Sequence, residues 1–431
     1  MAPDYNSLGR IVLSAIDNRV VPGVVIAAGR AGQVGLLEAF GQRQVEPESA
    51  PATVGTVYDL ASLTKAVVTS LLVMRGVEEG RLHLDRPIGD HLRMLEDRPE
   101  VTIRRVLTHS GGFPAHRKFH EKVLGKADPG HGSNRVGSPP ALGTHLTPCP
   151  PLGLPPSPSP AAHHRARPSA ASGVVGGGLG PRVWEPFQGS HMIVEMAAAE
   201  PLVYQPGSRS IYSDLGFILL GALLEQAMSE RLDVLAERML FHPLQLASTG
   251  FVDLRVGGPR AQFRGHDVAP TERCPVRGRL IHGEVHDLNA FAMGGVAGHA
   301  GLFGSIQDLL EIAFALCAAY HGRGVAGRAP FVRPEVLREF WQPAGIPGST
   351  WRLGWDGPST EGSLAGSLIS RRAVGHLSFT GCSLWIDPEQ ETCVVVLTNR
   401  VHPQVRDDPR FRALRPALHD AALQAIGYRT G

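Results

Sequence analysis

Apolar residues form strand-like runs at both ends of the chain and helix-like runs between them. Two runs at 24–28 and 34–40, separated by a Gly-Arg-Ala-Gly turn, predict a hairpin. Near the other end, residues 383–387 and 392–397 flank a Pro-Glu-Gln turn and predict a second hairpin. Strands at both ends indicate one antiparallel sheet built from the N- and C-terminal segments.

The segments between the hairpins carry apolar residues at helical spacing. A strong helix is predicted over 214–228, where it opens with a capping residue. The helix predicted over 62–80 is apolar nearly all round, which indicates burial. Further helices are predicted over 101–109, 192–199, 232–240, 306–319 and 411–426, and a Gly- and His-rich loop over 283–303. The pattern predicts a single two-lobed α+β domain over 1–431, with helices flanking the sheet and a helical lobe inserted mid-chain.

Residues 129–181 differ in composition from the rest of the chain. Of these 53 residues, 12 are proline and 10 are glycine, and none is acidic. Proline at this density cannot hold a helix or a central strand. We therefore expect a disordered Pro/Gly-rich insertion that is dispensable for folding, because a solvated loop has few contacts to lose.

The bulk composition excludes several classes of partner. A formal net charge of +2 favours neither nucleic acid nor an anionic membrane. No apolar run reaches the roughly 18 residues that a membrane span needs. The N-terminus lacks a basic segment followed by an apolar stretch, so we expect a cytoplasmic protein. A start site assigned too far downstream would make it periplasmic or secreted.

The five cysteines are widely spaced and odd in number. This pattern suits isolated thiols better than a disulfide framework or a zinc site.

One lysine stands out among the basic residues. Of 42 basic residues only four are lysine, yet Lys65 follows Ser62 by three positions. Unlike arginine, a lysine amine can lose its proton when burial and neighbours tune it. On a helix the two side chains share a face, and the first turn favours developing negative charge near the serine. The alternative is a helix-capping serine beside a surface lysine, since Ser-x-x-Lys is a short pattern that arises by chance.

Two further segments carry candidate chemistry. Tyr212 lies just before the 214–228 helix, and a phenol beside a lysine ammonium can exchange a proton with a serine. Alternatively, Tyr212 is a tyrosine at a helix entry with no chemical role.

The His-Leu-Ser-Phe segment at 376–379 leads into the C-terminal hairpin, where a strand edge could donate a backbone N–H to an oxyanion. Here His376 would add a cationic or hydrogen-bonding side chain.

Together and in this order, the three segments resemble the serine β-lactamase and penicillin-recognising family, in particular its class C β-lactamase, D-alanyl-D-alanine carboxypeptidase and esterase branch. That family shows Ser-x-x-Lys, then Tyr-x-Asn, then Lys-Thr-Gly or His-x-Gly. The resemblance covers nearly the whole chain except about 122–183. It extends to the segments around the motifs: 22–23, 58–65, 107–112, 204–207, 294–303 and 397–400.

The resemblance implies that substrate acylates Ser62 and that water hydrolyses the ester. Lys65 and Tyr212 would share the proton transfers. The backbone N–H groups of Ser62 and Phe379 would form the oxyanion hole, with His376 in the leading position of the third motif. It implies a small-molecule or peptide acyl substrate, and neither a cofactor nor a metal.

Three positions depart from the family pattern. Asp214 replaces the usual asparagine, so an anion would alter substrate contacts and the charge balance of Lys65. Leu377 lacks the hydroxyl that would contact a substrate carboxylate, and Ser378 adds bulk where glycine allows close approach. These changes weaken the case for a penicillin-like substrate and favour an esterase or amidase. The alternative is a catalytically weak homologue that binds peptidoglycan-like or acyl ligands without turnover.

Other polar or aromatic residues carry less weight. Two histidines, His282 and His286, lie near Glu284 and Asp287 and suggest a metal site. However, Gly283 breaks a helical pairing of the two histidines and no third ligand is evident, so we expect loop-structural roles for both. His109 is expected to brace the Ser-Gly-Gly turn that follows it. For Trp351 and Trp355, two alternatives stay open, namely lining a cleft and packing the sheet.

Overall fold

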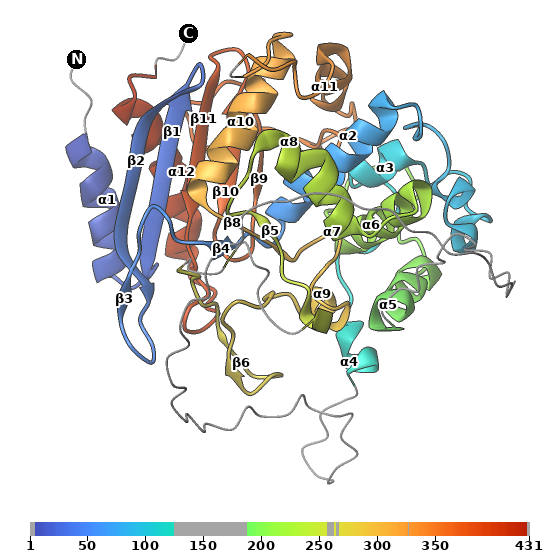
Figure 1. Ribbon diagram of the computed structural model, residues 1–431, viewed down its shortest axis with the longest axis horizontal. Coiled ribbons are helices and arrows are strands. Elements are labelled where there is room, and N and C mark those ends of the chain that lie inside the picture. The colour runs from blue at the N-terminus through green and yellow to red at the C-terminus, as the bar shows by residue number, and fades with distance from the viewer. Residues whose placement is uncertain (1–4, 125–187, 257–262, 264–266, 326, 429–431) are drawn as a thin grey trace, which may run out of the picture. The chain divides into compact units, whose positions relative to one another are not determined.

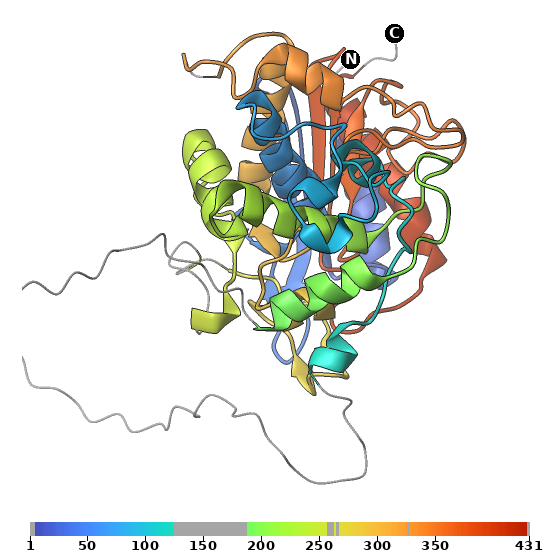
Figure 2. The ribbon, with the colours of Figure 1, turned by 90° about the vertical axis from the view of Figure 1, so that its right-hand side faces the viewer.

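The computed structural model describes residues 5–124, 188–256, 263, 267–325 and 327–428. The predicted insertion at 129–181 lies outside these residues. The described part has an α+β architecture in which one antiparallel sheet adjoins a largely helical region (Figures 1 and 2).

Six strands form the main sheet, and strands from the two ends of the chain meet at its centre. All its pairs are antiparallel, and Val25 of β1 faces Leu397 of β11. Both predicted hairpins are confirmed. In spatial order the strands are β3 (Ala50–Pro51), β2 (Gln33–Gln44), β1 (Gly23–Arg30), β11 (Thr392–Leu397), β10 (Ser383–Asp387) and β9 (Val374–Leu377).

Helices cover both faces of this sheet (Figure 1). Helices α1 (Tyr5–Asp17) and α12 (Pro409–Ala425) pack on one face with Val24 and Ile26. Helix α10 (Ile306–Tyr320) packs on the other with Val25. Consecutive residues of β1 enter opposite cores because side chains alternate across a strand. The sequence pattern predicted α10 and α12 but missed α1.

The helical region holds the segments that carry Lys65 and Asp214. A π-helical segment, η1 (Lys65–Ser70), leads into α2 (Leu71–Glu78). All of η1 and most of α2 are buried, as predicted. Helix α6 spans Asp214–Met228, with Ser213 Oγ accepting from the N–H of Gly216. The other helices are η2 (Ile88–Asp90), η3 (Arg93–Leu95), α3 (Ile103–Leu107), α4 (His120–Val123), α5 (Gln188–Ala199), α7 (Leu232–Ala236), η4 (Glu237–Phe241), α8 (His242–Leu244), η5 (Leu254–Val256) and α11 (Pro334–Phe340).

The prediction of a continuous loop over 283–303 is wrong. Asp287 accepts a hydrogen bond from the N–H of Ala290 and caps the short helix α9 (Leu288–Ala292). The segment ends in β8 (Leu302–Gly304), which pairs with β4 (Tyr58–Asp59) just before Ser62 and with β5 (Gly250–Phe251). A separate two-stranded sheet joins β6 (Arg273–Cys274) and β7 (Arg279–Leu280).

We predict that Gly375→Ala destabilises the sheet beside His376. A Cβ at this position would lie 2.3 Å from the Trp385 ring and 2.5 Å from the carbonyl oxygen of Leu384. Such overpacking costs about 1–3 kcal/mol. The urea unfolding midpoint should fall accordingly. Gly9→Ala on α1 is the matched control, since a Cβ there meets nothing within 4 Å. An equal midpoint for the two variants would contradict this packing.

Candidate active site

Ser62 lies in a constrained turn at the entry to the buried helix. The preceding residue, Ala61, has a positive φ of 43°, which L-residues adopt at a cost. The Asp59 carboxylate fixes this turn by accepting from the N–H of Ala61 at 2.8 Å and of His286 at 2.6 Å. The serine hydroxyl is thereby held at the helix start.

The side chains of Ser62, Lys65 and Tyr212 converge, as the sequence predicted. Lys65 Nζ lies 3.2 Å from Ser62 Oγ, on the same helical face. Tyr212 Oη lies 2.8 Å from the same oxygen, although 150 positions separate the two residues. The alternative of a surface lysine is wrong, because Lys65 is completely buried.

Lys65 is held as a cation by Asp214. The two side chains form an ion pair at 2.8 Å, and Lys65 also donates to the carbonyl of His299 at 2.9 Å. Burial alone would lower the pKa of Lys65, but the Asp214 carboxylate and the Tyr212 oxygen raise it above its ordinary value. Burial alone would raise the pKa of Asp214, yet Lys65 and His116 hold it well below its usual range. Asp214, in place of the family's asparagine, thus changes the charge balance of Lys65, as expected.

Both oxygens of Asp214 are engaged. Its second oxygen lies 3.0 Å from Nδ1 of His116, an exposed residue that the sequence reasoning missed. The hydrogen bond to Asp214 raises the pKa of His116. The carboxylate therefore bridges a buried amine and an imidazole that reaches solvent.

Tyr212 is positioned by His109. The imidazole Nδ1 accepts from the N–H of Ser213 at 3.1 Å, and its ring lies 4.7 Å from the Tyr212 ring. Burial holds the pKa of His109 well below its ordinary value, so the ring is neutral and can accept. Burial also raises the pKa of Tyr212, while the Lys65 ammonium acts in the opposite direction. The side chain of His109 therefore braces the Tyr212–Ser213 segment, which is a structural role, as expected, but at a different segment from the predicted Ser-Gly-Gly turn.

The third motif lies on β9 and the loop after it. Burial lowers the pKa of His376 to about 3, so its side chain is neutral and the cationic alternative is wrong. Ser378 is buried, and its hydroxyl pairs with Thr380 Oγ1 at 2.9 Å. Thr380 in turn donates to the Asp59 carbonyl at 2.8 Å, which ties this motif to the turn before Ser62. Arg415 of α12 donates to the Ser378 carbonyl.

Two backbone donors next to the serine are available. Within the described residues, neither the N–H of Ser62 nor that of Phe379 has a hydrogen-bond acceptor. The Phe379 ring stacks on His286 at 5.5 Å and is 49% exposed. These are the two donors that the resemblance implies for an oxyanion hole.

Ser62 opens into a pocket of about 460 Å³, here called the Ser62 pocket. Trp351 lines this pocket, whereas Trp355 is completely buried in the core. Of the two roles left open by the sequence, Trp351 therefore has the cleft-lining role and Trp355 the packing role. The pocket is lined by Ser62, Tyr212, Trp351, Asp356, Leu364, His376, Leu377, Ser378, Phe379, Arg400, Asp407, Asp408, Phe411, Arg412 and Arg415.

The other candidates have structural contacts. His282 contacts the Val268 carbonyl at 2.8 Å, and His286 lies 3.2 Å from Glu272. Oδ1 of Asp287 lies 2.9 Å from Nε2 of His299. No group of three or more potential metal ligands occurs within the described residues. The four cysteines that the structure describes are buried free thiols.

The Beta-lactamase family profile matches residues 10–419, almost the full length of the chain. The chain belongs to the beta-lactamase family. It is 30% identical over 378 residues to an Escherichia coli K12 protein named "Putative D-alanyl-D-alanine carboxypeptidase", covering 83% of this chain and 72% of that one. A protein of the same name from Escherichia coli O157:H7 is 29% identical over 430 residues, covering 93% and 83%. The family and these relatives identify the protein as a serine hydrolase.

Solved structures show the same fold. The octameric penicillin-binding protein homologue from Pyrococcus abyssi aligns with a TM-score of 0.65 at 20% identity, over 99% of this chain and 78% of that one. EstCE1, described as a hydrolase with promiscuous acyltransferase activity, aligns with a TM-score of 0.64 at 19% identity, over 97% of each chain. Among the described helices, none has the length and apolar character to cross a membrane.

We predict that Asp214→Asn moves the pH dependence of ester hydrolysis to lower pH. In the native site the pKa values of Lys65 and Tyr212 are both raised above their ordinary values. Because Tyr212 must lose its proton before it can accept one from Ser62, kcat/KM should rise as pH increases through the alkaline range. Removing the carboxylate lowers both pKa values, and the rise should move by about one to three pH units.

The measurement is the pH profile of kcat/KM for p-nitrophenyl acetate. Asp85→Asn is the control, because Asp85 pairs with Arg104 at the surface. Superimposable profiles for Asp214→Asn and the native protein would contradict the role of this ion pair.

Proposed function

We propose that the protein hydrolyses acyl substrates through a covalent ester at Ser62. Ser62 Oγ attacks the substrate carbonyl, whose oxygen becomes an oxyanion that accepts from the N–H groups of Ser62 and Phe379. When the tetrahedral intermediate collapses, the bond to the leaving amine or alcohol breaks. A water molecule then attacks the ester and releases the acid. The observation that carries this proposal is that an amine and a phenol both contact one serine oxygen, at 3.2 and 2.8 Å.

Tyr212 takes the serine proton after it has lost its own proton to solvent and become a phenolate. Lys65 is an ammonium whose charge is balanced by the Asp214 carboxylate. It has no lone pair with which to accept a proton, so it stabilises negative charge on its neighbours instead. A phenolate at position 212 would lie beside that ammonium, which lowers the cost of forming it in a buried site. The proton accepted from Ser62 passes from Tyr212 to the leaving group as the bond breaks. The reverse sequence, with water in place of the leaving group, completes the cycle.

The substrate class that we favour is a peptide ending in D-alanyl-D-alanine. Support comes from the names of the two Escherichia coli relatives, which match most of this chain. An ester is the second candidate, because Leu377 presents an apolar side chain to the Ser62 pocket and EstCE1 shares the fold. The assembled Ser62–Lys65–Tyr212 contacts argue against a binding protein without turnover.

We predict that a fluorophosphonate probe labels the native protein at Ser62 and that Ser62→Ala abolishes labelling. Intact-protein mass spectrometry should show one adduct per chain, because the buried ammonium and the phenol activate only this hydroxyl. Ser208→Ala is the control, since Ser208 is exposed and hydrogen-bonds only locally to Gln205.

The same measurement after incubation with an acetyl-D-alanyl-D-alanine peptide and with p-nitrophenyl esters should detect an acyl adduct and rank the two substrate classes. Folded native protein that takes up no probe would refute the acyl-enzyme proposal. Labelling that persists in Ser62→Ala would refute the assignment of the nucleophile.

A further inference from the structure

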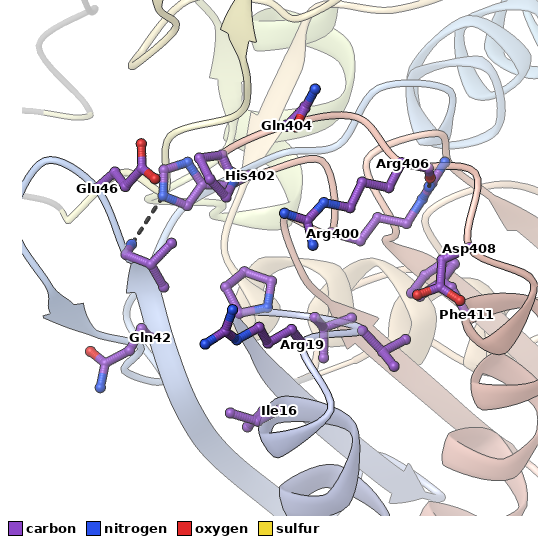
Figure 3. Close-up of a pocket in the computed structure, with 15 residues that line it drawn as sticks. Ile16, Arg19, Gln42, Glu46, Arg400, His402, Gln404, Arg406, Asp408 and Phe411 are labelled. Carbon is purple, nitrogen blue, oxygen red and sulfur yellow. Dashed lines mark hydrogen bonds between the residues drawn. The ribbon is translucent and has the colours of Figure 1, made fainter.

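A second pocket, here called the distal pocket, adjoins the Ser62 pocket. It encloses about 470 Å³ between the end of α1, the end of β2 and the segment that follows β11 (Figure 3). His402 fixes its inner side by accepting from the N–H of Val45 at 3.0 Å, and Nδ1 of the same ring lies 2.8 Å from the Thr271 carbonyl. Both ring nitrogens of His402 thus hold this side of the pocket in place through backbone groups.

The two pockets share the side chains of Arg400, Asp408 and Phe411. Arg400 donates to the Phe379 carbonyl at 2.9 Å and to the Arg406 carbonyl at 3.2 Å. Its guanidinium lies 5.0 Å from the centres of both the Phe379 and the Phe411 rings. Arg400 therefore lies at the junction, in contact with the residue whose N–H faces the proposed oxyanion.

Arginines outnumber carboxylates in the lining of the distal pocket: Arg19, Arg400 and Arg406 line it, against Glu46 and Asp408. Within the described part of the chain, none of the three arginines has a carboxylate within 4.0 Å, and Arg406 acts on the Asp408 carboxylate only from a longer distance. The two acidic residues of the lining are engaged elsewhere: Glu46 with Arg273 at 3.3 Å, and Asp408 with Arg410.

The remaining surface of the distal pocket is apolar or neutral. Ile16, Val20 and Val21 form an apolar wall next to the arginines, and Gln42 and Gln404 add amide groups. Such a mixture suits an extended molecule with an aliphatic stem and a planar anionic end, because guanidinium groups pair with carboxylates in two-point geometry.

We infer that the distal pocket binds a carboxylate on an extended substrate whose scissile carbonyl lies at Ser62. This inference rests on the proposed function at Ser62 and names the substrate class more closely: a molecule long enough to reach past Arg400 and anionic at the end remote from the scissile bond. Arg19 and Arg406 determine this specificity without touching the reacting atoms. A short neutral ester occupies only the Ser62 pocket.

The test compares two series of p-nitrophenyl esters with acyl chains of increasing length. In one series the chain ends in a carboxylate, and in the other it ends in a carboxamide of the same shape. A second pair of series carries these groups on the leaving alcohol, with acid release followed by titration. We expect kcat/KM to be at least about tenfold higher for the carboxylate esters than for the matching carboxamides once the chain is long enough to reach the distal pocket. This preference should occur with the group on the acyl chain or with the group on the leaving alcohol, but not with both.

Arg19→Gln/Arg406→Gln should remove most of this preference without changing kcat/KM for p-nitrophenyl acetate. Arg10→Gln/Arg86→Gln is the charge-matched control, since both residues are exposed and neither lines the Ser62 pocket or the distal pocket. Raising salt from about 0.01 to 1 M should weaken the preference, because the Debye length falls from about 30 to 3 Å.

Equal rates for carboxylate and carboxamide in every arrangement would overturn the inference while leaving the function at Ser62 intact. A preference that the double variant retains would overturn the assignment to Arg19 and Arg406. If no ester acylates Ser62, the proposed function itself fails, and that result is distinct from the other two.

Discussion

The ion pair between Lys65 and Asp214 controls the chemistry of the site. A completely buried ammonium is costly unless a carboxylate balances it, and here the two charged atoms lie 2.8 Å apart. The pair decides which neighbour of Ser62 can accept a proton. In the mechanism that we propose, the amine is fixed as a cation and supplies electrostatic stabilisation, so the serine proton goes to the phenolate of Tyr212. The carboxylate also contacts His116 at 3.0 Å, which connects the buried charges to solvent.

The fold brings these groups together from three separate stretches of chain. Asp59 holds the turn before Ser62, and its backbone carbonyl accepts from Thr380 of the third motif. His109 fixes the backbone of Ser213 and so the entry to α6. The sheet made from the two chain ends supports the third motif, and the helical region supports the other two. Each catalytic group therefore depends on a partner far from it in sequence.

Sequence reasoning could predict elements whose pattern is local. The hairpin at 383–397 and the helix over 214–228 follow from alternation, helical spacing and capping, and Ser62, Lys65 and Tyr212 follow from a family motif. Helix α1 was missed although its pattern is equally local, since Leu8, Val12 and Ala15 recur at helical spacing and are buried against the sheet. His116 and Arg415 were missed because their roles depend on contacts across 98 and 37 positions. The different fates of Trp351 and Trp355 depend on which side of one short segment faces the core.

The charge on Lys65 can be measured directly, because the chain has only four lysines. In protein carrying ¹³Cε-lysine, the Lys65 signal can be assigned by its absence in Lys65→Arg and followed by NMR as pH increases. Lys118 and Lys122 are exposed and provide internal references. We predict that Lys65 stays an ammonium beyond the ordinary lysine pKa of about 10.4 and that Asp214→Asn makes it titrate at lower pH. A native Lys65 that titrates near neutral pH would contradict the central claim, because the amine would then be free to take the serine proton itself.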